Sequence, residues 1–457
     1  MSTMTVTGTA SLDASHNPYG VCIDSNNAYV YVANYTANTV EQIRISDMTV
    51  TGTVDLGAAH SPRGVCIDST DTYVYVANYT ANTVEQIRLS DMTVTGTASL
   101  GASHGSVGVC IDSNNAYVYV ANFTANTVEQ IRLSDMTVTG TCDLGISHGP
   151  VAVCIDSNDT YVYVANNSAN TVEQIRLSDM TVTGTATLGA SHGPYSVCID
   201  SADAYVYVAN NTANTVEQIR LSDMTVTGTC DLGTGHGPYG VCIDSTDTYV
   251  YVANNSANTV EQIRLSDMTV TGTCSLGVSH DPVGVCIDSN NAYVYVANYA
   301  ANTVEQIRLS DMTVTGTASL GASHGPYAVC IDSNAIYVYV SNLTANTVEQ
   351  IRILWFPIWV SPADTADAAP GDALVWTSVV ATKRAHFRLQ VANDAGFSSG
   401  LVTYYSYNST GFEYWDGAAW VAFPRDGMPA AKTGNNVRYT STSGLSGTKY
   451  RRVAQTV

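Results

Sequence analysis

The stretch from residue 73 to residue 97 contains Tyr-Val-Tyr-Val-Ala-Asn at 73–78, Thr-Val-Glu-Gln-Ile-Arg at 83–88 and Met-Thr-Val-Thr-Gly-Thr at 92–97. Each segment is rich in β-branched or aromatic residues, and turn-forming residues separate the segments, as in short antiparallel strands. The apolar run Arg-Gly-Val-Cys-Ile-Asp at 63–68 precedes them and predicts one more strand. No segment has the 3.6-residue periodicity of an amphipathic helix. The pattern therefore predicts a four-stranded antiparallel meander.

The same unit occurs eight times with almost no change. Its methionine marks the phase of the repeat, at Met4, Met48, Met92, Met136, Met180, Met224, Met268 and Met312. Self-similarity with a period of about 40–50 residues is typical of β-propellers, in which each repeat forms one blade. We therefore predict an all-β fold, an eight-bladed β-propeller of 44-residue repeats over residues 1–353. The first strand of each blade is expected nearest the axis and the fourth at the rim.

The phase of the repeat also predicts how the ring closes. The chain opens with an outer strand at 4–12, and the eighth unit supplies only three strands, from 327 to 353. Leu-Trp-Phe-Pro at 354–357 stands where the other units have Ser-Asp-Met-Thr. We expect residues 4–12 to pair with residues 346–353, which removes an exposed sheet edge.

The repeat resembles a known family. Val-Tyr-Val-Ala-Asn, then Asn-Thr-Val, then a strand that ends in Ile-Arg are similar to the YVTN family of propeller repeats, over residues 4–353. This resemblance implies the propeller fold. Because known members occur in bacterial and archaeal surface proteins, it also implies a binding or scaffolding role.

A second domain is predicted at residues 354–457, where the composition changes. Seven strand-like runs within about a hundred residues favour a small β-sandwich, at 373–380, 386–392, 401–407, 412–414, 419–423, 437–442 and 450–457. Leu-Val-Trp at 374–376 and Tyr-Arg-Arg-Val at 450–453 resemble fibronectin type III-like modules, which implies a phage or bacterial surface protein. The apolar residues Trp355, Phe356 and Trp359 are expected to dock this module on the propeller.

Charge and hydropathy exclude some functions. The net charge is −21, and an acidic surface repels phosphate backbones, so we expect no nucleic-acid partner. No apolar run approaches the ~20 residues that a membrane span needs, so no membrane insertion is expected. The N-terminus lacks the basic and apolar regions of a signal peptide. These features favour a virion or extracellular surface protein that folds in a reducing cytoplasm.

The cysteines support folding under reducing conditions. Eight of the eleven occupy equivalent positions, at Cys22, Cys66, Cys110, Cys154, Cys198, Cys242, Cys286 and Cys330. Equivalent inner strands of neighbouring blades are expected about 10 Å apart, whereas a disulfide needs Cα atoms within about 7 Å. The eight are therefore predicted to be free thiols, which persist in a reducing compartment.

Acid–base residues recur in every unit, which favours structural roles. One histidine precedes each inner strand, as His16 does, and is expected to bond an aspartate such as Asp24. Glu41 and Arg44 are expected to form inter-blade ion pairs or to solubilise the rim. We predict no catalytic residue, no metal site and no cofactor. A lactonase-like or quinoprotein-like enzyme is disfavoured because catalysis needs a unique, asymmetric set of residues.

Two loop positions differ between units and predict a partner site. The position before the inner strand is Tyr19, Arg63, Val107, Val151, Tyr195, Tyr239, Val283 or Tyr327. The turn between the second and third strands carries Tyr35, Tyr79, Phe123, Asn167, Asn211, Asn255, Tyr299 or Leu343. Both loops open on one face of a propeller, and exposed aromatic residues mark partner sites. The tyrosines, Phe123 and Arg63 are the predicted site for a carbohydrate or receptor; neutral drift at unconstrained turns is the alternative.

Together these patterns predict a non-enzymatic structural or binding protein of a virion, such as a phage tail or decoration component. The alternative is a bacterial or archaeal cell-surface or extracellular filament protein. Residues 354–457 hold nine of the eighteen Lys and Arg residues. This segment is therefore expected to bind other structural proteins or copies of the chain.

Overall fold

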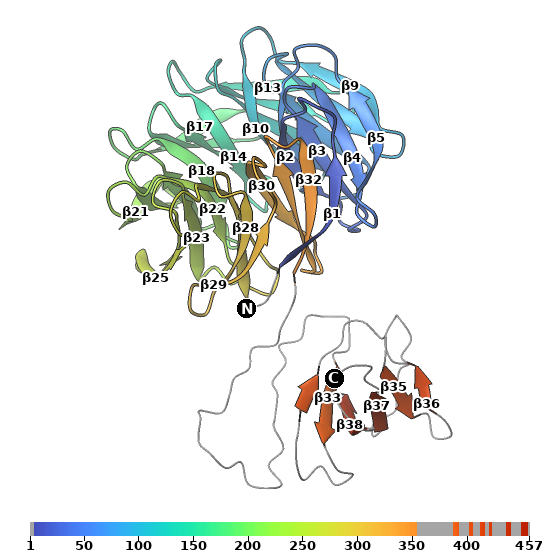
Figure 1. The fold of residues 1–457 in the computed structure, drawn as a ribbon. Coiled ribbons are helices and arrows are strands. Elements are labelled where there is room, and N and C mark those ends of the chain that lie inside the picture. The colour runs from blue at the N-terminus through green and yellow to red at the C-terminus, as the bar shows by residue number, and fades with distance from the viewer. Residues whose placement is uncertain are drawn as a thin grey trace. The chain divides into compact units, whose positions relative to one another are not determined.

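The computed structural model describes residues 4–353 and the short segments 387–392, 402–404, 412–415, 420–422, 436–439 and 449–455. The chain divides into two compact units, Met1–Phe356 and Pro357–Val457, and each is described by itself. The first unit consists of eight four-stranded sheets around a central axis (Figure 1). Within the described residues no helix is long and apolar enough to span a membrane.

Each blade follows the chain from the axis to the rim. The inner strands are β2 (Pro18–Ile23), β6 (Pro62–Ile67), β10 (Ser106–Ile111), β14 (Pro150–Ile155), β18 (Pro194–Ile199), β22 (Pro238–Ile243), β26 (Pro282–Ile287) and β30 (Pro326–Ile331). The second strands are β3 (Tyr29–Asn34), β7 (Tyr73–Asn78), β11 (Tyr117–Asn122), β15 (Tyr161–Asn166), β19 (Tyr205–Asn210), β23 (Tyr249–Asn254), β27 (Tyr293–Asn298) and β31 (Tyr337–Asn342).

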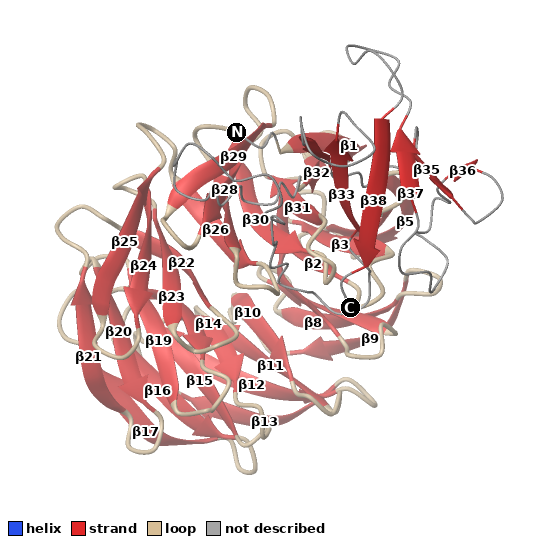
Figure 2. Cartoon of the chain, turned by 90° about the horizontal axis from the view of Figure 1, so that it is seen from below, coloured by secondary structure: helices blue, strands red, loops and turns tan. Residues whose placement is uncertain are grey.

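The outer half of each blade repeats just as regularly. The third strands are β4 (Thr39–Arg44), β8 (Thr83–Arg88), β12 (Thr127–Arg132), β16 (Thr171–Arg176), β20 (Thr215–Arg220), β24 (Thr259–Arg264), β28 (Thr303–Arg308) and β32 (Thr347–Arg352). The rim strands are β5 (Thr49–Asp55), β9 (Thr93–Ser99), β13 (Thr137–Asp143), β17 (Thr181–Thr187), β21 (Thr225–Asp231), β25 (Thr269–Ser275), β29 (Thr313–Ser319) and β1 (Thr5–Ser11). Figure 2 shows these sheets from below.

The N-terminal strand closes the ring, as the repeat phase predicts. β1 pairs antiparallel with β32, from Thr5 opposite Arg352 to Ser11 opposite Thr347. The eighth blade therefore has the order β1-β32-β31-β30. Both the eightfold repeat and its closure are confirmed.

The alternating second strand fills the space between blades. Tyr31 and Ala33 of the first blade pack against Val74 and Val76 of the second, and all four side chains are buried. Because both faces of each sheet contact a neighbour, neither face carries charged residues in this strand. The Tyr31 hydroxyl accepts a hydrogen bond from Gln42 Nε2 at 3.3 Å.

One glycine per rim strand admits a methionine from the next blade. The ladder between β4 and β5 shifts register beside Gly52, where a β-bulge forms. A Cβ atom at Gly52 would lie 2.5 Å from Cγ of Met92, which packs there from the following blade. This contact explains why the repeat keeps both the glycine and the methionine.

All eleven cysteines are free thiols, which confirms the prediction made for the eight equivalent ones. In the second unit, six strands form one sheet in the order β34-β33-β38-β37-β35-β36. They are β33 (Phe387–Ala392), β34 (Val402–Tyr404), β35 (Phe412–Trp415), β36 (Trp420–Ala422), β37 (Asn436–Tyr439) and β38 (Lys449–Gln455). The run at 373–380 and the docking residues Trp355, Phe356 and Trp359 lie outside the described residues, and the sandwich stays a prediction.

Candidate functional site at the channel mouth

A buried His–Glu–Asn network lies beneath the loop face of every blade. In the first blade, Nε2 of His16 lies 3.3 Å from Oε1 of Glu41. Asn34 Nδ2 donates to the other carboxylate oxygen at 2.9 Å. Burial raises the pKa of Glu41, while the hydrogen bond from Asn34 and the nearby His16 lower it. The pair recurs at 3.3–3.7 Å in all eight blades.

One predicted partnership in this network is wrong. The histidine bonds glutamate rather than aspartate, because Asp24 lies in a turn at the other end of the strands. There its Oδ1 accepts hydrogen bonds from the backbone N–H groups of Ala28 and Tyr29, at 2.7 and 3.0 Å. Of the two roles predicted for Arg44, the inter-blade ion pair is wrong, because Arg44 is exposed and pairs with Asp47 of its own blade at 2.6 Å.

Backbone groups beside this network join neighbouring loops. The backbone oxygen of His16 accepts hydrogen bonds from the N–H groups of Thr36 and Ala37. Asn38 Oδ1 accepts from the N–H groups of His60 and Ser61 in the next blade, at 2.7 and 2.8 Å. The backbone groups of each histidine therefore take part in holding neighbouring turns. In the described part of the chain, no three His, Cys, Asp or Glu side chains come together as a potential metal site.

Four tyrosines from four blades meet at the channel axis on this face. The hydroxyls of Tyr19 and Tyr327 lie 3.0 Å apart, and those of Tyr239 and Tyr327 lie 3.3 Å apart. Tyr195 hydrogen-bonds Tyr239, and their ring centroids are 4.0 Å apart. Burial and the neighbouring phenols raise the pKa of Tyr195 and Tyr327, so the hydroxyls stay protonated and can donate. We call these four residues the tyrosine cluster.

Arg63 joins the cluster from the second blade. Its guanidinium carbon lies 4.2 Å from the ring centroid of Tyr79, 5.2 Å from that of Tyr35 and 5.4 Å from that of Tyr19. These are cation–π distances. Its charge also lowers the pKa of Tyr195, against the larger effect of burial. Its Nε is buried and has no hydrogen-bond partner.

The second variable position holds neighbouring loops together. In three blades its ring lies over a glycine of the next blade: a Cβ at Gly105 would lie 3.3 Å from Tyr79, and one at Gly325 would lie 3.0 Å from Tyr299. Phe123 covers Gly149 in the same way. Where the residue is Asn, its amide instead donates to a proline carbonyl, as Asn167 does to Pro194 at 3.1 Å.

The predicted site residues are thus brought together only in part. Tyr19, Arg63, Tyr35, Tyr79 and the rest of the tyrosine cluster converge at the mouth, whereas Phe123 and Tyr299 serve their own blade boundaries. The aromatic side chains were expected to be exposed, but most are half-buried because they pack on one another. Tyr299, at 37% exposure, is the most open of the set.

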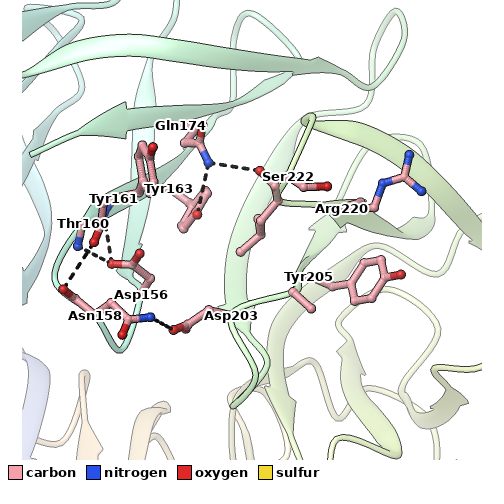
Figure 3. Close-up of a pocket in the computed structure, with 12 residues that line it drawn as sticks. Asp156, Asn158, Thr160, Tyr161, Tyr163, Gln174, Asp203, Tyr205, Arg220 and Ser222 are labelled. Carbon is pink, nitrogen blue, oxygen red and sulfur yellow. Dashed lines mark hydrogen bonds between the residues drawn. The ribbon is translucent and has the colours of Figure 1, made fainter.

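A groove on the opposite face was not predicted. It lies between the fourth and fifth blades, has a volume of about 640 Å³ and is lined by Asp156, Tyr161, Tyr163, Gln174 and Arg220 among others (Figure 3). Gln174 there bonds Tyr163 and the Leu221 carbonyl. Because these five lining residues recur in every unit, the sequence holds no signal that singles out this boundary.

Comparisons with known proteins agree on the fold. The profile of the family described as "Lactonase, 7-bladed beta-propeller" matches residues 2–271, more than half of the chain. The eight sheets here exceed the seven blades of that description. No curated protein sequence matches the chain.

Solved structures are similar at low identity. Hydrazine synthase of Kuenenia stuttgartiensis has a TM-score of 0.54 and 16% identity, over 76% of this chain and 99% of that one. Virginiamycin B lyase from Staphylococcus aureus has a TM-score of 0.53 and 13% identity, over 76% of this chain and 98% of that one. The C-terminal WD40 domain of Sif2 has a TM-score of 0.65 and 11% identity, over 78% of this chain and 99% of that one. At these identities the similarity shows the fold alone.

Proposed function

The chain belongs to the lactonase family of β-propellers, and we propose that it is a non-enzymatic binding protein that recognises a receptor at its channel mouth. One observation carries the proposal. Where the loops meet the axis, eight otherwise near-identical blades differ, and there they place four phenols and one guanidinium together. Binding sites combine aromatic surface with a few oriented polar groups in this way.

The acid–base residues support binding rather than catalysis. Each histidine is engaged with a buried glutamate, and each glutamate also bonds an asparagine, as Glu41 does Asn34. Eight equivalent networks offer no unique reaction centre, whereas catalysis needs a nucleophile or base in a distinct environment.

The setting that we propose is a virion, with a bacterial or archaeal surface or filament as the alternative. The free thiols support folding in a reducing compartment. Residues 354–457, as a fibronectin type III-like sandwich, would contact other structural proteins or further copies. Light scattering and electron microscopy of the full chain separate these settings: open-ended filaments favour the alternative, and a discrete particle favours a virion component.

A glycan array tests receptor binding. The full chain and a variant with Val at positions 19, 195, 239 and 327 are applied to neutral and acidic polysaccharides. Valine already occupies this position in three blades, as Val107, Val151 and Val283. We expect the wild type to bind and the variant to lose binding while its circular dichroism is unchanged. Equal binding by both proteins would contradict the proposal.

A lactone-opening or lyase activity is the second candidate, because the family profile is that of lactonases and a lyase is structurally similar. Hydrolysis of a sugar lactone consumes water and releases a proton from the new acid. A pH-stat therefore measures it directly. We expect no rate above background. If the wild type hydrolyses the lactone above background and the four-valine variant does not, the enzymatic function is favoured.

A further inference from the structure

Arg63 differs in its partners from seven of the other propeller arginines. Seven arginines at the ends of third strands pair with an aspartate three residues later, as Arg88 does with Asp91. Within residues 4–353, Arg63 makes no ion pair or hydrogen bond, and its contacts are with aromatic rings. An unpaired guanidinium can anchor an anion through its N–H donors.

The surroundings of Arg63 hold it in place and leave its donors unused. Tyr79, Tyr35 and Tyr19 lie on the guanidinium within 5.4 Å. Arginine carries five N–H donors in a planar fork that matches both oxygens of a carboxylate. The phenols of the tyrosine cluster use most of their protons in bonding one another, and their oxygens remain as acceptors near that charge.

The loop face around this anchor is rich in hydroxyls. Beside the tyrosine rings, Thr36, Thr80 and Thr124 are exposed at the tips of the turns. Aromatic rings offer an apolar face on which a pyranose can lie, and hydroxyl groups exchange hydrogen bonds with its substituents. We propose that Arg63 binds the carboxylate of an acidic sugar whose ring lies against Tyr35 and Tyr79. This inference rests on the proposed receptor binding and names its ligand class.

A peptide ligand fits this face less well. Extended peptides are held by free backbone N–H and C=O groups or in apolar grooves. Here the turn N–H groups of Thr36 and Ala37 already bond His16, and those of the following turn bond His60. A sugar needs only the side chains that remain available.

Isothermal titration calorimetry of the full chain tests the proposal. The probes are trigalacturonic acid and its methyl ester, which keeps the sugars and removes the charge. The variant is Arg63→Val, the residue that three blades carry at this position. The matched control is Arg88→Gln, which removes one positive charge from a pair on the opposite face. A charged hydrogen-bonding pair corresponds to about 10- to 100-fold in affinity.

We expect Arg63→Val and methyl esterification each to weaken binding by about that factor, and Arg88→Gln to leave it unchanged. Equal binding of the acid and the ester, or equal binding by Arg63→Val, would overturn the carboxylate assignment. Binding of polyglutamate or inorganic phosphate as tightly as the trisaccharide would overturn the sugar assignment. If the wild type binds neutral glycans on the array and Arg63→Val binds them equally well, the proposed function stands and this inference fails.

Discussion

The His–Glu–Asn networks and the channel mouth lie in the same loop layer, yet they vary in opposite ways. The networks recur in all eight blades, and beside them Asn38 joins its turn to the loop of the next blade. The mouth places tyrosine, arginine or valine at one equivalent position. Substituting a side chain that satisfies buried polar groups leaves donors or acceptors unpaired. Substituting a side chain that points to the axis leaves no buried polar group unpaired. Within this layer, the networks are the residues that stabilise the ring, and the positions at the mouth are the residues that can change between blades.

Breaking one network should have the largest effect. In Glu129→Ala, Asn122 and His104 lose their shared acceptor. We expect a loss of about 2–4 kcal/mol in the free energy of unfolding, because buried polar groups without partners cost about 1–3 kcal/mol each. Urea unfolding followed by circular dichroism measures it. Glu129→Gln, which can still accept from Asn122, should lose less; equal losses would contradict the hydrogen-bond account.

The blade boundary at the rim should be the next most sensitive. A Cβ in Gly140→Ala would lie 2.5 Å from Cγ of Met180, so the methionine must move, at a cost of about 1–3 kcal/mol. Thermal unfolding should show a lower midpoint. Gly235→Ala is a control for backbone strain without a clash: its φ is +81°, a Cβ there meets nothing within 4 Å, and Ala59 adopts φ +62° at the equivalent position. We expect it to lower the midpoint less than Gly140→Ala does. Similar shifts in both variants would refute the packing explanation.

The networks should also make stability depend on pH in a defined direction. Burial raises the pKa of Glu129 above its ordinary value of 4.5, against the opposing effects of His104 and Asn122. The folded state therefore holds this proton more tightly, and its contribution to stability is present below pH 4.5 and is lost as pH rises through the folded-state value. Relative to wild type, Glu129→Gln should gain stability as pH rises from 4 to about 8. A difference that stays constant with pH in urea titrations would rule this out.

The smallest effect is expected at the mouth. Tyr195→Val removes the hydrogen bond to Tyr239 and a ring contact, yet three blades already carry valine at this position. We expect at most about 1 kcal/mol of destabilisation in the same urea assay. A loss as large as that of Glu129→Ala would show that the tyrosine cluster holds the ring, and the contrast between the two regions would disappear.

Much of the fold could be predicted because it depends on local pattern. The period of the repeat determines the blade, and its phase determines that β1 completes the sheet of β30–β32. The partners of long side chains could not be predicted in this way. His16 and Asp24 are closer in sequence than His16 and Glu41, but they lie at opposite ends of the inner strand. Antiparallel pairing returns Glu41 to the end of the blade where His16 lies.

The sequence by itself determined an eight-bladed, N-terminally closed propeller with free thiols, because hydrophobic alternation and turn residues act within each unit. It also located the two variable loop positions on one face. Only the tertiary structure decided that the tyrosines at 19, 195, 239 and 327 bond one another, that Arg63 lies against three aromatic rings, and that Tyr79 covers Gly105. Those contacts join residues from different blades, and their distances are set by how the ring closes rather than by any one repeat.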